Sequence, residues 1–326
     1  MPDAASKPPA GEFLSGSFTN EAGTRDYKLY IPAGFPGQRA ALVVMLHGCT
    51  QDPDDFAAGT RMNALADERG FLVIYPAQAQ AANKSRCWNW FNAADQHRDR
   101  GEPSLIAGIT RRIVADYPID ERRVFIAGMS AGGALSAIMA VTYPELYAAV
   151  GIHSGMPFGS VQDLFSALAA MRYGATTVPT PDTPLIPLIA VHGGHDKTVS
   201  PFNGERLVTQ WLAAAAQEVA APTIENAEHN GRAYRRTTYH DSRGQVLVEY
   251  WAVRALGHAW SGGSRAGSHT DPRGPDASRE MLRFFLGAPE TAGGRKVGLR
   301  RRLMRGLKAL RSAESSGSPD APTTTA

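Results

Sequence analysis

The sequence predicts an α/β protein built on a mostly parallel β-sheet with helices on both faces. Short apolar segments alternate with helical segments along the chain, which is typical of a parallel sheet whose strands are joined by helices. Several apolar segments are almost uninterrupted, as expected for strands that are covered on both faces. The 43% of apolar and 20% of charged residues are ordinary for a globular protein with a sizeable core.

The expected elements follow one another in a regular order. Strands are expected at residues 27–31, 41–46, 71–75, 123–127, 148–153, 185–191 and 246–253. Helices are expected at residues 61–68, 105–117, 131–142, 204–219 and 277–286. In the 105–117 segment the apolar side chains recur at helical spacing, which is the pattern of a helix that packs one face against a sheet.

A single domain with two tails accounts for the 326 residues. We expect residues 1–15 to be a flexible N-terminal segment, residues 16–288 to be the domain, and residues 289–326 to be a basic segment and a disordered tail. The N-terminus has no apolar stretch of the signal-peptide kind, although a trimmed mature chain would look the same. No run of 18 apolar residues occurs, so no membrane-spanning helix is expected.

The segment Gly-Met-Ser-Ala-Gly at 128–132 follows an expected strand and opens an expected helix. A nucleophile elbow requires this context, because the Ser130 hydroxyl must project from a tight turn at the end of the strand. Glycine at 128 and 132 avoids Cβ atoms that would collide in such a turn. A helix-capping serine in a Gly-rich turn is the alternative. The pattern predicts an α/β-hydrolase fold with Ser130 as nucleophile.

A nucleophilic serine of this kind needs backbone N–H groups directed at the developing oxyanion. One is expected from the residue after the nucleophile, Ala131. The other is expected from the loop after an earlier strand, where His-Gly-Cys stands at 47–49, and the Cys49 amide is the candidate. We expect His47 to shape this turn beside the substrate rather than to act as a base, because it ends an early strand.

The base and the acid are expected later in the chain, because this fold has the order nucleophile, acid, base. Asp196 stands in a Gly-rich loop after an expected strand, where it would orient the base. His258 stands in the loop after the last expected strand, which is the place of the base. Asp163 and Asp182 are the competing acids, and neither ends an apolar strand.

The other histidines fit these roles less well. His153 also follows a strand and is placed to line the site, but it precedes the acid in the chain. The spacing of His192, His195 and Asp196 resembles that of metal ligands, but a third distant ligand is missing. We therefore expect no metal, and the proposed chemistry needs no organic cofactor.

Four segments together resemble the poly(3-hydroxybutyrate) depolymerase family of esterases, which also contains feruloyl and acetylxylan esterases. They are Leu-His-Gly-Cys-Thr-Gln at 46–51, Cys-Trp-Asn-Trp-Phe at 87–91, Gly-Met-Ser-Ala-Gly-Gly at 128–133 and Gly-His-Ala-Trp-Ser-Gly-Gly at 257–263. The resemblance covers about residues 16–286. It implies a serine esterase that cleaves hydroxyalkanoate esters through Ser130, His258, Asp196 and an acyl-enzyme. Hydrolysis of feruloyl or acetylxylan esters and acyl transfer are the alternatives.

The two cysteines, Cys49 and Cys87, form either one disulfide or two buried thiols. The resemblance implies the disulfide, which would fix the oxyanion loop to the Trp-rich loop. Core packing is one interpretation of the tryptophans in that loop. The other is an apolar wall around the substrate, formed by Trp88, Trp90, Phe91 and Trp260.

The sequence also departs from the family pattern. Met129 stands where the family more often has Leu. Extracellular members that erode crystalline polymer carry a linker and a separate polymer-binding domain, which these 326 residues lack. We therefore expect the substrate to be soluble oligomers or amorphous polymer.

A basic segment precedes the C-terminal tail. Residues 295–311 contain eight Lys and Arg and no acid, which leaves the rest of the chain at −5 from a total of +3. A mildly acidic body argues against nucleic-acid binding. Leucines at 299, 303, 307 and 310 predict a basic amphipathic helix for contact with a granule or membrane surface, and a solvated tail or an oligomer contact are the alternatives. The two signals of cellular compartment differ: a disulfide indicates an oxidising compartment, whereas an N-terminus without a signal peptide indicates the cytoplasm.

Overall fold

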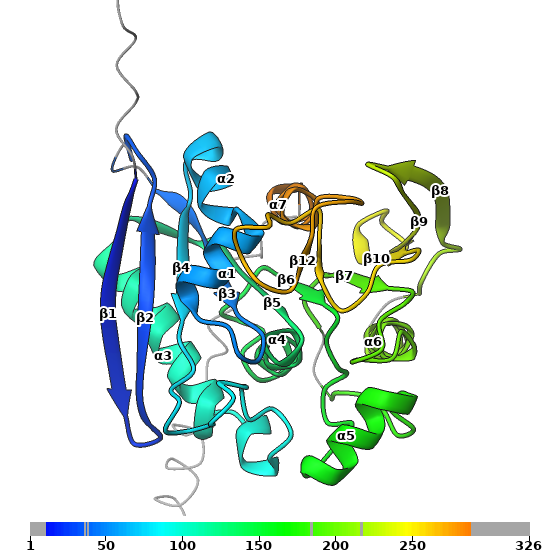
Figure 1. Cartoon of the computed structure of the whole chain (residues 1–326), viewed down its shortest axis with the longest axis horizontal. Coiled ribbons are helices and arrows are strands. Elements are labelled where there is room, and N and C mark those ends of the chain that lie inside the picture. Colours follow the sequence, from blue (N-terminus) through cyan, green and yellow to red (C-terminus); the bar gives the residue numbers. More distant parts are fainter. Residues whose placement is uncertain (1–10, 36, 38, 183–184, 216–217, 288–326) are drawn as a thin grey trace, which may run out of the picture. The chain divides into compact units, whose positions relative to one another are not determined.

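A central β-sheet organises the computed structural model, which describes residues 11–35, 37, 39–182, 185–215 and 218–287 (Figure 1). Within these ranges the sheet has ten strands. They are β1 (Glu12–Asn20), β2 (Gly23–Ile31), β3 (Ala40–Leu46), β4 (Leu72–Pro76), β5 (Ile119–Met129), β6 (Ala149–His153), β7 (Leu188–Gly193), β8 (Thr223–His229), β9 (Arg232–His240) and β10 (Val246–Val253). Two further short strands, β11 (Trp260–Ser261) and β12 (Thr270–Asp271), pair with each other.

The strand order is β1-β2-β4-β3-β5-β6-β7-β10-β9-β8. The strands from β4 to β10 in this order run parallel. The outer strands β1, β2, β9 and β8 are joined antiparallel at the two edges. The carboxyl ends of β5, β7 and β10 therefore lie along the same edge of the sheet, where loops that are far apart in the sequence can meet.

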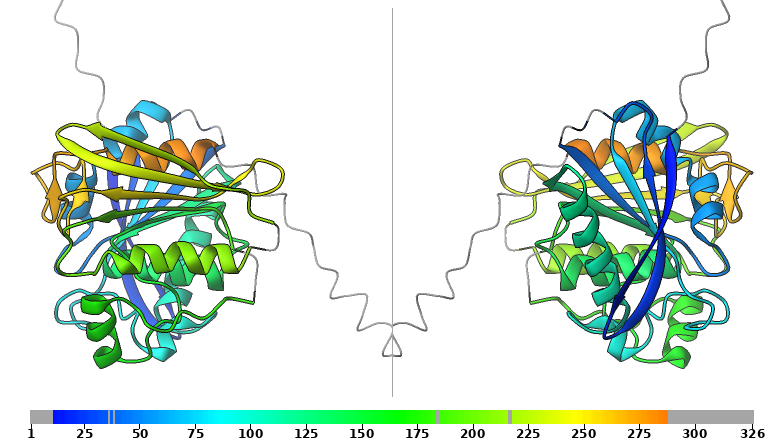
Figure 2. Two further views of the ribbon diagram at one scale, coloured as in Figure 1. Left: turned by 90° about the vertical axis from the view of Figure 1, so that its right-hand side faces the viewer. Right: turned by 90° about the vertical axis from the view of Figure 1, so that its left-hand side faces the viewer.

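Helices cover both faces of the sheet (Figures 1 and 2). They are α1 (Pro53–Thr60), α2 (Met62–Arg69), α3 (Gly101–Asp116), α4 (Ala131–Thr142), α5 (Leu164–Tyr173), α6 (Phe202–Ala213) and α7 (Ala277–Gly287), with a 3₁₀ turn η1 (Ala93–Gln96). Strand β3 shows why two layers are needed. Its Leu42 and Val44 pack into a core shared with α3, α4 and α6, whereas Val43 and Met45 pack into a core shared with α1, α2 and α7. Every residue of β3 is buried, as its apolar sequence predicts.

The predicted fold class is confirmed, but several boundaries and elements differ. The strands β1, β8 and β9 were not predicted, because they mix exposed or partly buried positions with polar residues instead of forming apolar runs. Strand β1 begins at Glu12, so residues 12–15 are not the flexible segment that was expected. The helix expected at 204–219 ends at Ala213, and Val219 instead forms a β-bridge with Asp241.

The helical region before β4 and the segment after β6 also differ from expectation. Arg61 has a left-handed backbone, with φ of 56°, and separates α1 from α2, so the expected helix at 61–68 is the second of two. Helix α5 was not predicted. None of the described helices is both long enough and apolar enough to cross a membrane.

All described residues belong to the first of two compact units, Met1–Thr291. The second unit, Ala292–Ala326, lies outside the described residues. The predictions of a basic amphipathic segment at 295–311 and of a disordered tail fall on that second unit.

Candidate active site

Ser130 stands in a strained turn between β5 and α4. Its φ of 55° and ψ of −119° are unusual for a residue with a side chain. The turn is tight because the neighbouring loop approaches closely: a Cβ atom at Gly132 would lie 2.1 Å from the carbonyl oxygen of Leu46. A Cβ atom at Gly128 would lie 2.3 Å from the carbonyl oxygen of Gly132. The two glycines therefore permit the backbone conformation that presents the Ser130 hydroxyl, as the pattern predicted.

A continuous chain of hydrogen bonds joins Ser130, His258 and Asp196. His258 Nε2 lies 2.9 Å from Ser130 Oγ, and His258 Nδ1 lies 2.7 Å from Asp196 Oδ2. The three residues come from the loops after β5, β10 and β7, which meet at one edge of the sheet. With the Nδ1 proton donated to the carboxylate, Nε2 is left to accept the serine proton.

Asp196 is held as an ionised acceptor. Its side chain is fully buried, and its Oδ1 accepts the N–H groups of Thr198 and Val199 at 2.9 and 2.8 Å. Burial by itself would raise the pKa of Asp196, but the hydrogen bond and charge of His258, together with the Val199 N–H, outweigh it and lower the pKa. The carboxylate therefore stays charged at neutral pH, where it orients the imidazole.

Backbone hydrogen bonds fix the acid loop against the base loop. The N–H of Gly194 donates to the carbonyl of Val253, and the N–H of His195 donates to that of Leu256, both at 2.9 Å. A Cβ atom at Gly193 would lie 2.4 Å from the Leu256 oxygen, so glycine is needed for this approach. The distance between Asp196 and His258 is thus set by main chain.

Two unpaired backbone N–H groups stand beside Ser130, at Cys49 and Ala131. Neither donates a hydrogen bond to a group in the part of the chain that the structure describes. Ala131 is the first residue of α4, and the N–H groups of a first helical turn have no partner within the helix. Cys49 lines the cavity at Ser130, and Ala131 directly follows Ser130 in the chain, so one of the two N–H groups predicted to stabilise an oxyanion belongs to the cavity wall and the other to the residue next to it.

His47 fixes the peptide group that contains the Cys49 N–H. Its Nε2 accepts the N–H of Gln78 at 3.0 Å, so Nδ1 holds the proton and donates to the Gly48 carbonyl at 2.7 Å. In a trans peptide the carbonyl and the N–H point in opposite directions, so holding the Gly48 oxygen directs the Cys49 N–H the other way. Burial lowers the pKa of His47 to about 4, which keeps the ring neutral.

The cavity at Ser130 has a volume of about 260 Å³. Its wall combines the oxyanion loop, the elbow, the acid and base loops and one side chain of α5. The lining residues are Gly48, Cys49, Thr50, Gln51, Met129, Ser130, Met171, Thr198, His258 and His269.

The expected aromatic wall of the substrate site is wrong. His47, Trp88, Trp90 and Trp260 are buried, Phe91 is partly buried, and none of these five residues lines the cavity at Ser130. Two of the tryptophans donate buried hydrogen bonds instead. Trp88 Nε1 donates to the His47 carbonyl at 3.1 Å, and Trp260 Nε1 donates to Ser278 Oγ at 3.1 Å. The sequence motifs identified these loops but not the direction in which their aromatic rings point.

The disulfide between Cys49 and Cys87 is present. It joins the loop after β3 to the loop after β4, across 38 residues of sequence. Because Cys49 also contributes an unpaired N–H at the cavity, the disulfide restrains that N–H directly.

His153 is a site residue whose role the sequence did not reveal. It is fully buried at the end of β6, and its Nε2 accepts the N–H of Ser261 at 3.1 Å. Its ring stacks on Trp260, with 5.0 Å between the centroids. Burial lowers the pKa of His153 to about 3, so the ring is a neutral acceptor. Its position at a strand end was the available signal, but the chain order of acid and base gave it no role.

The candidate metal ligands His192, His195 and Asp196 differ in burial. His192 and Asp196 are buried, whereas His195 is exposed. His192 Nε2 lies 3.0 Å from the Val199 carbonyl, which accepts its proton. In the described ranges, no group of three His, Cys, Asp or Glu side chains has the arrangement of metal ligands.

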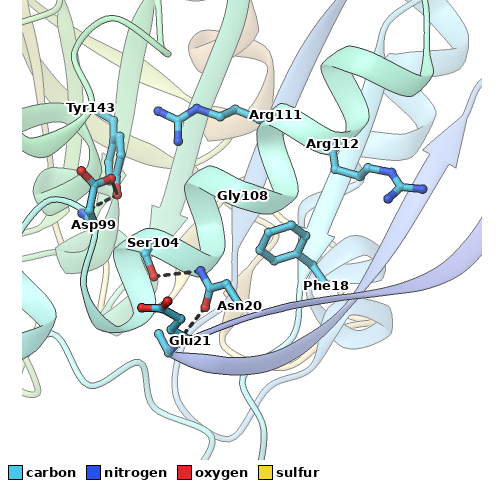
Figure 3. A pocket seen from close by; sticks show the side chains of 10 residues that line it. Phe18, Asn20, Glu21, Asp99, Ser104, Gly108, Arg111, Arg112 and Tyr143 are labelled. Atoms are coloured by element: carbon cyan, nitrogen blue, oxygen red, sulfur yellow. Dashed lines mark hydrogen bonds between the residues drawn. The ribbon is translucent and has the colours of Figure 1, made fainter.

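A second cavity, of about 660 Å³, lies away from Ser130, between the end of β1 and α3 (Figure 3). Its lining includes Asn20, Ser104, Arg111 and Tyr143. Ser104 Oγ accepts the Asn20 amide at 3.1 Å, and no histidine lines this cavity. Without a base beside its serine, it lacks the arrangement found at Ser130.

Comparisons with known proteins find depolymerases and esterases among the relatives of this chain. Relatives include the poly(3-hydroxyalkanoate) depolymerase C of Paucimonas lemoignei, which is 30% identical over 257 residues, covering 75% of this chain and 60% of the relative. The probable acetylxylan esterase A of Aspergillus fumigatus is 27% identical over 244 residues, covering 68% of this chain and 63% of the relative. The chain thus spans about three-fifths of the length of these curated relatives.

The fold is also that of a solved esterase structure. The acetyl xylan esterase from Aspergillus awamori superposes with a TM-score of 0.63 at 22% identity, covering 75% of this chain and 94% of that one. This similarity confirms the α/β-hydrolase fold. The family model described as esterase PHB depolymerase matches residues 25–229, which is more than half of the chain. The chain therefore belongs to the esterase PHB depolymerase family.

Proposed function

We propose that this protein is a serine carboxylic-ester hydrolase that cleaves hydroxyalkanoate esters through an acyl-enzyme. The observation that carries the proposal is the chain of hydrogen bonds from Asp196 through His258 to Ser130, at 2.7 and 2.9 Å. The chain of hydrogen bonds ends at a cavity lined by Ser130 and Cys49, and the N–H groups of Cys49 and Ala131 have no hydrogen-bond acceptor in the described part of the chain. Acyl transfer needs these parts and no metal.

In the first half of the reaction, His258 Nε2 takes the proton of the Ser130 hydroxyl as Oγ attacks the ester carbonyl carbon. The carbonyl oxygen becomes an oxyanion, which accepts hydrogen bonds from the N–H groups of Cys49 and Ala131. The bond between carbon and the alcohol oxygen then breaks. His258 gives its Nε2 proton to the leaving alcohol, and the acyl group stays on Ser130.

In the second half, water replaces the alcohol. His258 Nε2 takes a proton from the water, whose oxygen attacks the acyl carbon and forms a second oxyanion at the same two N–H groups. The bond to Ser130 Oγ breaks, the protonated His258 returns a proton to Oγ, and the free acid leaves. Asp196 stays ionised throughout and stabilises the charged imidazole.

The hydroxyalkanoate assignment rests on the relative from Paucimonas lemoignei and on the cavity. Met129, Met171 and the disulfide make part of the wall apolar, which suits an aliphatic acyl group. The second relative is an acetylxylan esterase, and its name makes acetylated sugars the alternative. Feruloyl esters are a further alternative by family.

Replacement of Ser130 by alanine tests the chemistry. We expect Ser130→Ala to lower turnover of p-nitrophenyl butyrate by at least ~10³-fold with an unchanged fold. The matched control is Ser104→Ala, which removes the hydroxyl at the other cavity and should leave turnover unchanged. A Ser130→Ala variant that keeps its activity would remove Ser130 from the reaction.

A substrate panel tests the assignment. Release of acid from 3-hydroxybutyrate oligomers should exceed release of acetate from acetylated xylo-oligosaccharides and of ferulate from feruloylated ones, compared as kcat/KM. The opposite ranking would keep the mechanism and replace the substrate.

A further inference from the structure

Most of the large apolar side chains that are exposed in the described part of the chain gather in one region. Five of them, between 54% and 89% exposed, lie on α5 and at the start of α6. They are Leu164, Phe165, Leu168, Tyr173 and Phe202. A single exposed apolar residue needs no explanation, but a cluster on two adjoining helices marks a contact surface.

The helical spacing on α5 connects this surface to the cavity at Ser130. Leu164, Leu168 and Met171 are four and three residues apart, so they form one stripe along the helix. Met171 lines the cavity, while Leu164 and Leu168 continue the stripe outward over about 10 Å. The helix buries a different side, because Ala167 and Ala170 face the core. The apolar wall of the cavity thus extends onto the protein surface.

Helix α5 is fixed in this position. Asp163 caps its first turn by accepting the Ser166 N–H at 2.8 Å. At its other end, Asn203 Nδ2 donates to the Ala170 carbonyl at 2.9 Å, and the N–H of Ser200 donates to the Met171 carbonyl at 2.6 Å. Residue 200 belongs to the loop that follows Asp196, so α5 is tied to the acid loop. Figures 1 and 2 show α5 on the far side of α6 from the sheet, at the outside of the molecule.

We propose that this stripe binds the part of a long aliphatic polyester chain that extends beyond the cleaved ester bond. The inference rests on the proposed function, because the cavity holds the bond that is cleaved. Continuity of the stripe with the cavity at Met171 selects a ligand that occupies both. Arg172 is the one charged residue of α5, so the surface suits an uncharged, apolar ligand and offers no complement to a polyanion.

The test separates long from short substrates. In a Leu164→Ser/Leu168→Ser variant, the initial rate on a limiting suspension of amorphous poly(3-hydroxybutyrate) should fall at least ~10-fold, which corresponds to about 1.4 kcal/mol. The kcat/KM for p-nitrophenyl butyrate should stay within about twofold, because this ester fits inside the cavity. The matched control is Leu14→Ser/Ile224→Ser, which removes two similarly exposed residues from β1 and β8.

A binding assay keeps the inference separate from the proposed chemistry. Sedimentation with the polymer suspension is measured in the Ser130→Ala background, with and without the α5 substitutions, and binding should depend on Leu164 and Leu168. Equal rates and equal sedimentation for the α5 and control variants overturn the inference while leaving the esterase intact. Polymer hydrolysis that continues in the Ser130→Ala variant overturns the proposed function instead.

Two other occupants of the stripe give different results. If a second copy of the chain covers it, the α5 substitutions change the mass measured by light scattering and not the sedimentation with polymer. If a lipid surface covers it, they reduce binding to phosphatidylglycerol vesicles and not to polymer. Either result overturns the proposal.

Discussion

The backbone carbonyl of His153 accepts the amide N–H of Ser130 at 2.9 Å. The imidazole of the same residue accepts the N–H of Ser261, three residues beyond His258. His153 therefore joins the elbow to the loop that holds the base, without touching the reacting atoms. A displacement of about 1 Å at such a site costs on the order of 10²-fold in rate, so a residue that fixes both loops matters for turnover.

We expect His153→Leu to lower kcat for p-nitrophenyl butyrate by ~10- to 100-fold with little change in KM, because the Ser261 N–H loses its acceptor and the base loop shifts. His153→Gln should restore most of kcat, since its side-chain oxygen can accept the same N–H. Steady-state kinetics of the two variants, compared at equal folded fraction, is the measurement. Equal losses in both variants would show that His153 contributes volume alone.

Asp196→Asn should lower kcat by ~10³- to 10⁴-fold and leave the fold intact. The Asn oxygen can still accept the N–H groups of Thr198 and Val199, so the loop keeps its shape. The Asn side chain is uncharged, so it cannot stabilise a charged imidazole. Its NH₂ group would also face His258 Nδ1, where the carboxylate accepted a proton. The control is Asp182→Asn, which changes the exposed acid that competed with Asp196 in the sequence and should leave kcat unchanged. Activity lost on Asp182→Asn and kept on Asp196→Asn would exchange the two assignments.

The parallel centre of the fold and the three-residue constellation were predictable for definite reasons. Strands such as β3 are buried on both faces and so consist of apolar residues alone, which a sequence displays directly. Ser130 is identified by flanking glycines that the tight turn requires, and the chain order of acid and base leaves few choices for Asp196 and His258. Each of these signals is local or ordered along the chain.

The elements that were not predicted depend on tertiary packing. Strands β1 and β8 lie at the sheet edges with one exposed face, so their sequences contain more polar than apolar residues. The aromatic wall was wrong for a related reason. A tryptophan beside Cys87 has the same local sequence whether its ring points into the cavity or into the core, and the hydrogen bond from Trp88 to the His47 carbonyl places it in the core.

Removal of the disulfide should cost stability more than activity. Closing a loop of 38 residues is worth about 4 kcal/mol in the chain-entropy model, so Cys49→Ala/Cys87→Ala should lower the free energy of unfolding by a few kcal/mol. The Cys49 N–H is also directed by His47, through the Gly48 carbonyl, so kcat should fall less than ~10-fold. Urea unfolding and steady-state kinetics measure the two effects.

Reducing agent provides the control for this prediction. Dithiothreitol should destabilise the unsubstituted protein toward the value of the double variant and have no effect on the variant itself. A double variant as stable as the parent would show that the loop after β3 is held by its hydrogen bonds alone.

Buried neutral histidines should make the protein sensitive to acid. Burial lowers the pKa of His47 to about 4 and that of His153 to about 3, whereas both have the ordinary value of 6.5 when unfolded. Between pH 6.5 and 4 the unfolded chain therefore binds protons that the folded chain does not, and the free energy of unfolding falls as pH falls. Each histidine contributes a slope of roughly 1 kcal/mol per pH unit in this window.

Urea unfolding between pH 7 and pH 4.5 measures this slope, and His47→Gln isolates one contribution to it. The variant should have a lower free energy of unfolding at pH 7, because Gln replaces a buried ring that both accepts from Gln78 and donates to the Gly48 carbonyl. Its dependence on pH should nevertheless be flatter by roughly 1 kcal/mol per pH unit, since one group that binds a proton on unfolding is gone. The exposed His229→Gln variant is the matched control and should keep the slope of the parent. Parallel pH profiles for His47→Gln and the parent would mean that His47 is already protonated in the folded protein, and its Nε2 could not then accept the Gln78 N–H.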